Sequence, residues 1–373
     1  MKAKIMKVKI EDLVSAIERT LKAIGRTLNG ITIRKAKDVL EIHRTNGSSY
    51  AVSKIAGIPG SQFRAQIDGS RLLNLLKGVD PAQDCEILMD DKFLRVHFGS
   101  VKAKLPLLAE EYTLLSDTQW GGYRKALTLG TDCRQMLRQV IPACADDKDS
   151  RYFLRGVLLD RCPEGKLILV GTNGNWMTTI HTGFDTQNWP TKDVIVPTQM
   201  LTTLVDSISQ KAEVDVEFAT GENGAHGIYF KTNDFEFLSP LIEAKYPLWK
   251  KVMPMIDESE SFQVAPSGFL SAVKRMHSII SGAESYHGID LFVKDKTLKV
   301  LAKTTFDTDS NDVSVEAIDL DDTNAEADML INATYLVDAL LVANEAKIQV
   351  QIANNKLNMV DGKAQTVIMG MTR

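Results

Sequence analysis

The chain has 373 residues, of which 44 are Lys or Arg and 48 are Asp or Glu, so its formal net charge at pH 7 is −4. This length predicts two or three domains, and 44% hydrophobic with 25% charged residues is typical of a globular protein without long disordered stretches. The acidic total excludes a protein that coats nucleic acid with uniform positive charge, but it permits a locally basic surface.

Cysteine usage and the N-terminal sequence indicate in which cellular compartment the protein is expected. Cys85, Cys133, Cys144 and Cys162 form no C-x-x-C pair, which argues against a zinc site or a disulfide framework. The first residues, MKAKIMKVKIEDLV, lack the apolar core of a signal peptide, and no apolar run approaches the ~20 residues that cross a bilayer. We expect a soluble cytoplasmic protein with reduced thiols, no membrane association, no metal and no cofactor.

Three amphipathic helices open three similar segments of the chain. Each shows apolar residues at i, i+3 or i+4, the spacing of a half-buried helix. They are predicted over 13–24, 133–141 and 269–280. A second helix with the same apolar spacing follows in each segment, and after it comes a strand with period-two alternation. The second helices are predicted over 70–79, 198–208 and 333–343, and the strands over 86–89, 214–218 and 348–352.

The sequence therefore predicts an α+β fold made of three copies of one plan. Each copy is about 124 residues long, a normal domain size. It holds two helices and an antiparallel sheet, with the helices on one face of that sheet. We place the domains at 1–124, 125–254 and 255–373.

Positive charge collects on the polar faces of these helices, although the chain as a whole is acidic. For a single helix, a solvated charged face is the simpler interpretation. The first helix of each of the three segments has more positive than negative charge on its polar face. We therefore expect a partly basic surface that contacts duplex phosphates without reading the base sequence. Asp206 and Asp338 on the later helices limit it. The helix residues assigned to this surface are Arg19, Lys22, Arg26, Arg71, Lys77, Arg134, Arg138, Lys274 and Arg275.

An ordered set of motifs resembles the bacterial DNA polymerase III beta sliding clamp. The motifs are SRYFLRGVLLD (150–160), LVGTNGNWM (169–177), VIVPTQML (194–201), FEFLSPLIEAKYPLWKKVMP (235–254), INATYLVDAL (331–340) and VIMGMTR (367–373). The resemblance implies a head-to-tail homodimeric ring of six similar domains. Such a ring encircles double-stranded DNA and tethers the polymerase for processive synthesis, with no chemistry and no catalytic residue of its own.

The resemblance also implies three kinds of site. A pocket between the second and third domains takes short linear motifs from DNA polymerase, the clamp loader and repair proteins. Its matching positions are Leu154, Thr172, Gly174, Asn175, Trp176, Met177, Pro247, Lys251, Val252, Asn332, Tyr335, Val367, Ile368, Met369, Gly370 and Met371. DNA contacts would come from Arg26 and from the loop that carries Lys148 and Tyr152. The dimer contact would join Ala103 and Leu105 to Ile279 and Ile280.

Two positions depart from the family pattern within the pocket. Trp176 stands where the family usually has a basic residue, and we expect it to make the pocket wall flatter and more apolar. Gly370 stands where the family's terminal motif has a proline. These changes bear on which partner motif is preferred rather than on the fold.

Two other classes of function remain as alternatives. Catalysis is disfavoured because the six histidines show no H-x-x-x-H pair, and no G-x-S-x-G or P-loop pattern occurs. The second alternative is a scaffold of a replication or repair complex that binds peptides through the same pocket without forming a ring.

Overall fold

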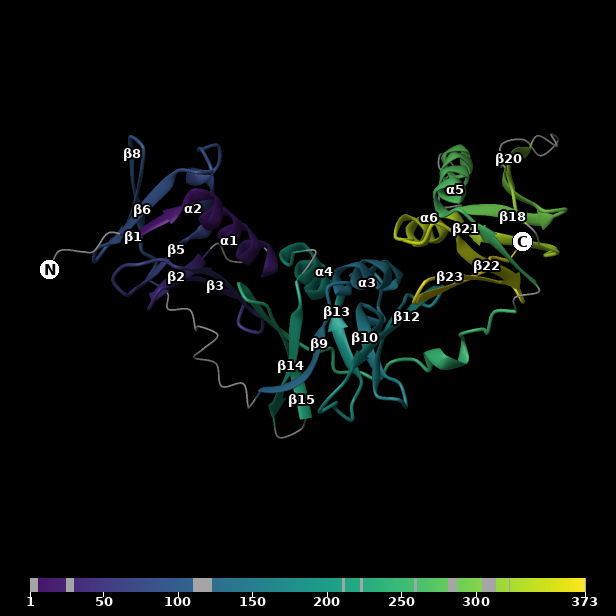
Figure 1. Ribbon diagram of the computed structural model, residues 1–373, viewed down its shortest axis with the longest axis horizontal. Helices are drawn as coiled ribbons and strands as arrows, with labels where there is room; N and C mark the ends of the chain where they lie inside the picture. The colour runs from purple at the N-terminus through teal and green to yellow at the C-terminus, as the bar shows by residue number, and fades with distance from the viewer. Residues whose placement is uncertain are drawn as a thin grey trace. The chain divides into compact units, whose positions relative to one another are not determined.

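A computed structural model describes residues 6–24, 30–109, 123–209, 212–221, 224–257, 260–280, 287–303, 313–321 and 323–372. One order of elements occurs three times along the chain: a strand, a helix, four strands, a helix and three strands (Figure 1). All six helices and the three strands predicted from periodicity are present, within a few residues at their ends.

The bounds of the elements follow the repeats. The first repeat holds β1 (Met6–Lys9), α1 (Ile10–Ala23), β2 (Gly30–Ala36), β3 (Val39–Thr45), β4 (Tyr50–Ala56), β5 (Phe63–Asp68), α2 (Gly69–Leu76), β6 (Asp84–Met89), β7 (Phe93–Phe98) and β8 (Val101–Pro106). The second holds β9 (Tyr123–Leu129), α3 (Cys133–Val140), β10 (Gly156–Arg161), β11 (Lys166–Thr172), β12 (Trp176–Asp185), β13 (Val194–Pro197), α4 (Thr198–Ser207), β14 (Val214–Gly221), β15 (Gly224–Lys231) and β16 (Phe235–Pro240), with short 3₁₀ helices η2 (Ile141–Ala143), η3 (Tyr152–Leu154) and η4 (Trp249–Lys251). The third holds β17 (Ser261–Val264), α5 (Pro266–Ile280), β18 (Gly288–Lys294), β19 (Thr297–Lys303), β20 (Val313–Asp319), β21 (Ala327–Asn332), α6 (Ala333–Leu341), β22 (Ile348–Ala353), β23 (Lys356–Asp361) and β24 (Ala364–Met369).

Contacts group the chain into two compact units, and the division passes through the second repeat. The first unit comprises Met1–Arg134, Gln187–Lys192 and Gln199–Leu241, and the second comprises Gln135–Thr186, Asp193–Thr198 and Ile242–Arg373. The expected boundary at 124/125 falls inside β9, so the second repeat begins at or before Tyr123. The boundary at 254/255 falls between η4 and β17. Division into three separate domains stays a prediction.

The first unit contains two antiparallel sheets. One has the order β1-β6-β7-β8, and the other has the order β5-β2-β3-β4-β16-β15-β14-β9. The larger sheet joins two repeats, because β4 pairs with β16 from Phe235↔Ser53 to Leu238↔Tyr50. Helices α1 and α2 share one core with strands of both sheets, in which Leu13, Ile17 and Ile33 are fully buried.

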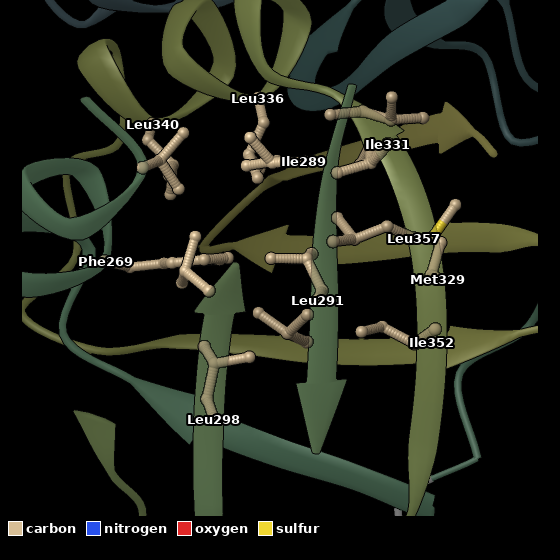
Figure 2. Packing of buried hydrophobic residues seen from close by; sticks show 14 of the residues in the cluster. Phe269, Ile289, Leu291, Leu298, Met329, Ile331, Leu336, Leu340, Ile352 and Leu357 are labelled. Carbon is tan, nitrogen blue, oxygen red and sulfur yellow. The ribbon is translucent and has the colours of Figure 1, made fainter. Parts of the chain in front are cut away.

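The second unit repeats this arrangement with other strands. Its sheets have the orders β13-β10-β11-β12-β24-β23-β22-β17 and β20-β19-β18-β21. Strand β12 pairs with β24, which again joins two repeats in one sheet. In Figure 2, Phe269 of α5 and Leu336 and Leu340 of α6 point toward Leu291 and Leu298 of the smaller sheet. The same core continues to Ile352 and Leu357 of the larger sheet, so the helices pack where two sheets meet rather than on one sheet alone.

The helix ends are stabilised locally. The side chain of Asp68 accepts from the backbone N–H of Arg71 at the start of α2, and that of Asn332 accepts from Thr334 at the start of α6. At the other end of α1, Arg44 donates from Nη1 to the carbonyl oxygen of Leu21, which matches a cation to the negative end of the helix. Within the described ranges, no helix is long and apolar enough to cross a bilayer.

Candidate partner-docking site

The turn between β11 and β12 is held by its own side chains. Thr172 donates from Oγ1 to the carbonyl oxygen of Trp176 at 2.7 Å and accepts from the N–H of Gly174. Asn173 accepts from the N–H groups of Asn175 and Trp176. Gly174 has φ +89°, and a Cβ there would lie 2.6 Å from Nη1 of Arg151, so glycine suits both the backbone and the space. The turn is therefore a fixed platform.

The end of β24 is fastened to this platform and to its own hairpin. The N–H of Met369 donates to the carbonyl oxygen of Asn175 at 2.9 Å, and that of Gly370 donates to Asn355 at 2.8 Å. A proline at position 370 would have no N–H for the second bond. A Cβ at 370 would also lie 1.9 Å from Oδ1 of Asn355, so the glycine at this position matches the turn that it contacts.

Trp176 lies beneath the surface rather than on it. Its side chain is 2% exposed, and its ring stacks on that of Tyr335, with centroids 5.9 Å apart and planes at 18°. We expected this ring to form a flat pocket wall; instead it packs with Ile368 in the core and supports Tyr335 from below. Asn175, from the same turn, donates to the Tyr335 hydroxyl at 3.4 Å.

Exposed apolar side chains lie on the 247–252 segment and at the end of β24. Leu248 is 64% exposed, Val252 42% and Met369 36%, while Pro247 is exposed and Met371 is half-buried. We call these five residues the docking surface. The two segments that carry them adjoin, because Lys356, which is opposite Met369 in the sheet, donates to the carbonyl oxygen of Val252.

A buried layer fixes the 246–252 segment that carries part of the docking surface. The indole Nε1 of Trp249 donates to Asp160 at 3.1 Å, and the N–H of Tyr246 donates to Asp193 at 2.7 Å. Both rings pack with Leu154 and Met177 in one apolar cluster. Of the predicted pocket residues, Leu154, Thr172, Trp176, Met177, Val367 and Ile368 are buried, whereas Gly174, Asn175, Pro247, Lys251, Val252 and Met369 are exposed and Asn332, Tyr335, Gly370 and Met371 are intermediate.

Leu248 was missed by the sequence reasoning. It lies in the quoted motif AKYPLWKK between Pro247 and Trp249, and it is more exposed than Val252 or Met369, which were assigned to the pocket. The sequence signal for its exposure was the neighbouring Pro247, which is typical of a short turn. A turn of three residues can bury side chains on one side only, so one of its neighbours is left exposed. Trp249, the first residue of this turn, is buried, whereas Leu248 directly before it is exposed.

The side chains assigned to DNA separate into two groups. Five already contact protein: Arg19 pairs with Asp234, Arg71 with Asp68, Lys77 with Glu18 and Arg275 with Glu316, and Arg134 donates to the carbonyl oxygen of Val205. Four are exposed and have no ion pair with a described residue: Lys22, Arg138, Lys148 and Lys274. Tyr152 is 52% exposed, and Arg26 lies outside the described residues.

Arg19 shows what protein contact does to such a charge. Its guanidinium lies 2.6 Å from the Asp234 carboxylate, donates to Ser53 and sits 5.1 Å from the ring centroid of Phe235. Burial by itself would raise the pKa of Asp234, but the hydrogen bond and charge of Arg19, together with a hydrogen bond from Thr232, hold that pKa below its usual value. This pair joins α1 to the β15–β16 turn within the first unit.

The loop at 148–152 is ordered by a similar pairing. Arg151 makes a two-pronged contact with Asp149, and this hydrogen bonding lowers the pKa of Asp149 to about 2. Arg151 also donates to the carbonyl oxygen of Asn173 at 2.8 Å, which connects the loop to the docking platform. Lys148 and Tyr152 are left pointing to solvent.

The residues assigned to the dimer contact are unequal in exposure. Leu105 is 8% exposed and Ile280 is 3% exposed, and each packs in the core of its own unit. Ile279 is 39% exposed, and Ala103 lies on β8, an edge strand. Only these last two present surface that a second chain could cover.

Among the described residues, no three His, Cys, Asp or Glu side chains cluster closely enough to hold a metal ion. Burial raises the pKa of the Cys85 thiol to about 12 and that of the Cys133 thiol to about 11, so both are poor nucleophiles.

Comparison with known proteins decides the family. Residues 131–248 match the central domain of the DNA polymerase III beta subunit, and residues 250–372 match its C-terminal domain. The chain belongs to the DNA polymerase III beta subunit family. Members of this family are beta sliding clamps, processivity factors without enzymatic activity, and this chain is one of them.

Individual relatives agree with this family while being distant in sequence. The beta sliding clamp of Escherichia coli K12 is 21% identical over 318 residues, which cover 84% of this chain and 82% of the relative. That of Proteus mirabilis is 22% identical over 351 residues and covers 92% of each chain. A Borrelia burgdorferi beta subunit structure, in complex with a natural product, has a TM-score of 0.84 at 19% identity and covers 99% of both chains.

Ligands have been observed in two further clamps of the same fold. A Caulobacter crescentus beta sliding clamp, with a TM-score of 0.83 at 18% identity over 100% of this chain and 99% of that one, has polyethylene glycol bound to a putative beta-motif tethering region. A Pseudomonas aeruginosa clamp, with a TM-score of 0.82 at 20% identity over the full length of both chains, is bound to griselimycin.

Proposed function

We propose that two copies of this chain close into a head-to-tail ring around duplex DNA, and that the docking surface tethers a polymerase and other replication or repair proteins to it. The observation that carries the tethering role is the docking surface itself. It exposes Leu248, Val252 and Met369 above a hydrogen-bonded, buried layer. The chain also belongs to a family of sliding clamps. Replication takes place in the bacterial cytoplasm, and we place the protein there.

The surface suits a short apolar segment. Two anchors that each contribute about 1.5–3 kcal/mol, less the cost of ordering the peptide, correspond to roughly micromolar affinity. Exchange between partners requires weak binding of this kind, and methionine can repack around different ligands. The ring then raises the local concentration of the bound partner at the template without any strong contact to DNA.

Two edge strands support the ring over a scaffold without one. β8 is one of the two edge strands of the first four-stranded sheet, and β20 is one of the two edge strands of the other. β8 carries exposed Lys102 and Lys104, whereas β20 carries exposed Asp319, its Glu316 being already paired with Arg275. Opposite charges on two unpaired edges favour their pairing between two chains, which is how a head-to-tail ring would close.

Retention on DNA tests the proposal. The protein is loaded onto nicked circular DNA by a clamp loader and passed through a sizing column at moderate salt, before and after the DNA is cut once. A ring stays on the circle and slides off the linear form. Equal loss of the protein from circular and linear DNA would contradict the ring. A protein that binds partner peptides but is not retained on circular DNA would favour the scaffold.

A further inference from the structure

A lysine that the sequence did not single out lies in the middle of the docking surface. Lys356 begins β23 and is opposite Met369 of β24. Its Nζ donates to the carbonyl oxygen of Val252 at 3.2 Å. The ammonium group is therefore held between the two apolar segments, with Val252 on one side and Met369 on the other.

This ammonium group has no counter-charge within the described part of the chain. No carboxylate oxygen of a described residue lies within 4 Å of it, and the side chain is half-buried. Lys251, at the end of η4 and next to Val252, is exposed and likewise without an ion pair there. By contrast, Lys166 contacts Asp185 at 2.6 Å and Lys250 contacts Asp160 at 3.3 Å, so other lysines of the second unit do pair with acids.

We infer that the docking surface selects a peptide that carries a carboxylate beside its apolar anchors, and that Lys356 is the residue that recognises this carboxylate. The inference rests on the docking role proposed above and names the chemistry of the partner. A peptide whose anchors cover Val252 and Met369 must pass over the ammonium group between them. A carboxylate at that point gains a charge-assisted hydrogen bond, whereas a neutral residue gains none and a basic residue is repelled.

A peptide fits these residues better than nucleic acid does. Phosphate would satisfy Lys356 and Lys251, but it would leave Leu248, Val252 and Met369 exposed to water. An acidic peptide satisfies both kinds of group together, because its apolar side chains cover the exposed surface while its carboxylate meets the ammonium. The combination of an uncompensated cation with flanking apolar groups is what points to this occupant.

The test uses matched fluorescent decapeptides and the whole protein. All peptides share two leucine anchors, and each pair differs only by Asp against Asn at one non-anchor position, with that position moved along the peptide. We expect the wild-type protein to prefer Asp by about two- to fivefold at one or two positions, the range of a partly exposed ion pair. The preference should shrink as salt is raised.

Two lysine variants then test whether Lys356 is the residue that causes the preference for Asp over Asn. Lys356→Met keeps the length and apolar stem of the side chain but removes the charge, and it should abolish the discrimination between Asp and Asn. Lys363→Met is the control, since Lys363 also donates to a backbone carbonyl, that of Thr182 at 3.2 Å, from the same hairpin. It should leave the preference intact.

The possible failures are distinguishable. If the wild-type protein binds Asp and Asn peptides equally, or if Lys356→Met still discriminates, the inference is wrong while the docking role stands. If no peptide of the set binds, both the inference about Lys356 and the proposed docking role are wrong. If a single-stranded oligonucleotide binds more tightly than every acidic peptide and loses that affinity in Lys356→Met, the lysine serves phosphate and the inference is overturned.

Discussion

The ring of Trp176 stacks on the ring of Tyr335 at a centroid distance of 5.9 Å, with the tryptophan buried and the tyrosine half-buried above it. The two residues come from different repeats, β12 of the second and α6 of the third. The stack therefore holds the helix of one repeat against the strand of another directly beside the docking surface.

Removing the buried ring should cost more than removing the hydroxyl above it. We expect Trp176→Ala to lower the free energy of unfolding by about 3–5 kcal/mol, as for other large buried aromatics. Tyr335→Phe keeps the stack and loses only the 3.4 Å contact with Asn175, so its effect should stay below about 1 kcal/mol. Denaturant titrations of both variants check this, and a Trp176→Ala protein as stable as wild type would disprove the stacking role.

Met369 should contribute to partner binding without contributing to the fold. At 36% exposure its side chain is available to a ligand, and we expect Met369→Ala to weaken binding of an apolar peptide about five- to tenfold. Combined with Tyr335→Ala the loss should be larger, and the dimer should remain intact. Leu341→Ala, also on an exposed apolar residue, serves as the control, and an equal loss there would mean that the effect is not local.

The Arg19–Asp234 pair should make stability depend on pH. Because the folded-state pKa of Asp234 is lowered, its contribution is full above the unfolded pKa of about 4 and is lost as pH falls through the folded value. Asp234→Asn should thus lower the free energy of unfolding by about 1 kcal/mol at pH 7, and progressively less below about pH 4. Asp185→Asn, in an exposed pair with Lys166, should show a smaller difference at pH 7. A constant difference at all pH values would rule out the ionic explanation.

Neighbouring cations on α5 should differ in their effect on DNA binding. Lys274 is exposed without an ion pair among the described residues, whereas Arg275 is bound by Glu316, which raises the pKa of the arginine further. If Lys274 contacts a phosphate, Lys274→Gln should reduce the slope of log K against log salt by about 0.9 per contact. Arg275→Gln should change it much less. Anisotropy of a labelled duplex at several salt concentrations measures both, and identical slopes would remove Lys274 from the DNA surface.

Adjacent isoleucines at the end of α5 should separate assembly from folding. Ile279→Asp places a charge on a 39% exposed position, and we expect it to convert a dimer to monomers while the melting temperature changes little. Ile280→Asp buries a charge at a 3% exposed position and should unfold the second unit. Light scattering and thermal melts distinguish the two results. An Ile279→Asp protein that stays dimeric would place the interface elsewhere.

Much of the fold was predictable because its signals are local. The apolar spacing of Leu13 and Ile17 determines a helix from its own residues, and the alternation over 348–352 determines a strand. The pairing of β4 with β16 was not predictable, because the two strands are about 180 residues apart and their edges carry no periodic signal.

The candidate site was predictable only in part, for a related reason. A residue type indicates chemistry but not exposure, and exposure depends on what packs above it. Trp176 was expected to form a flat pocket wall and is buried, Leu248 was passed over and is exposed, and Arg19 looked available but contacts Asp234. Lys356 gave no signal, since its importance comes from Val252, which lies more than 100 residues away in the sequence.

The two sheets that cross repeat boundaries have a consequence for how the chain can be divided. Cutting between repeats would leave β16 without β4 and β12 without β24, so a central fragment would carry two bare strands along its margins. Such a fragment would tend to self-associate instead of folding alone. Exchange of one repeat between clamps should therefore succeed only where the new repeat preserves the pairing of β4 with β16 and of β12 with β24.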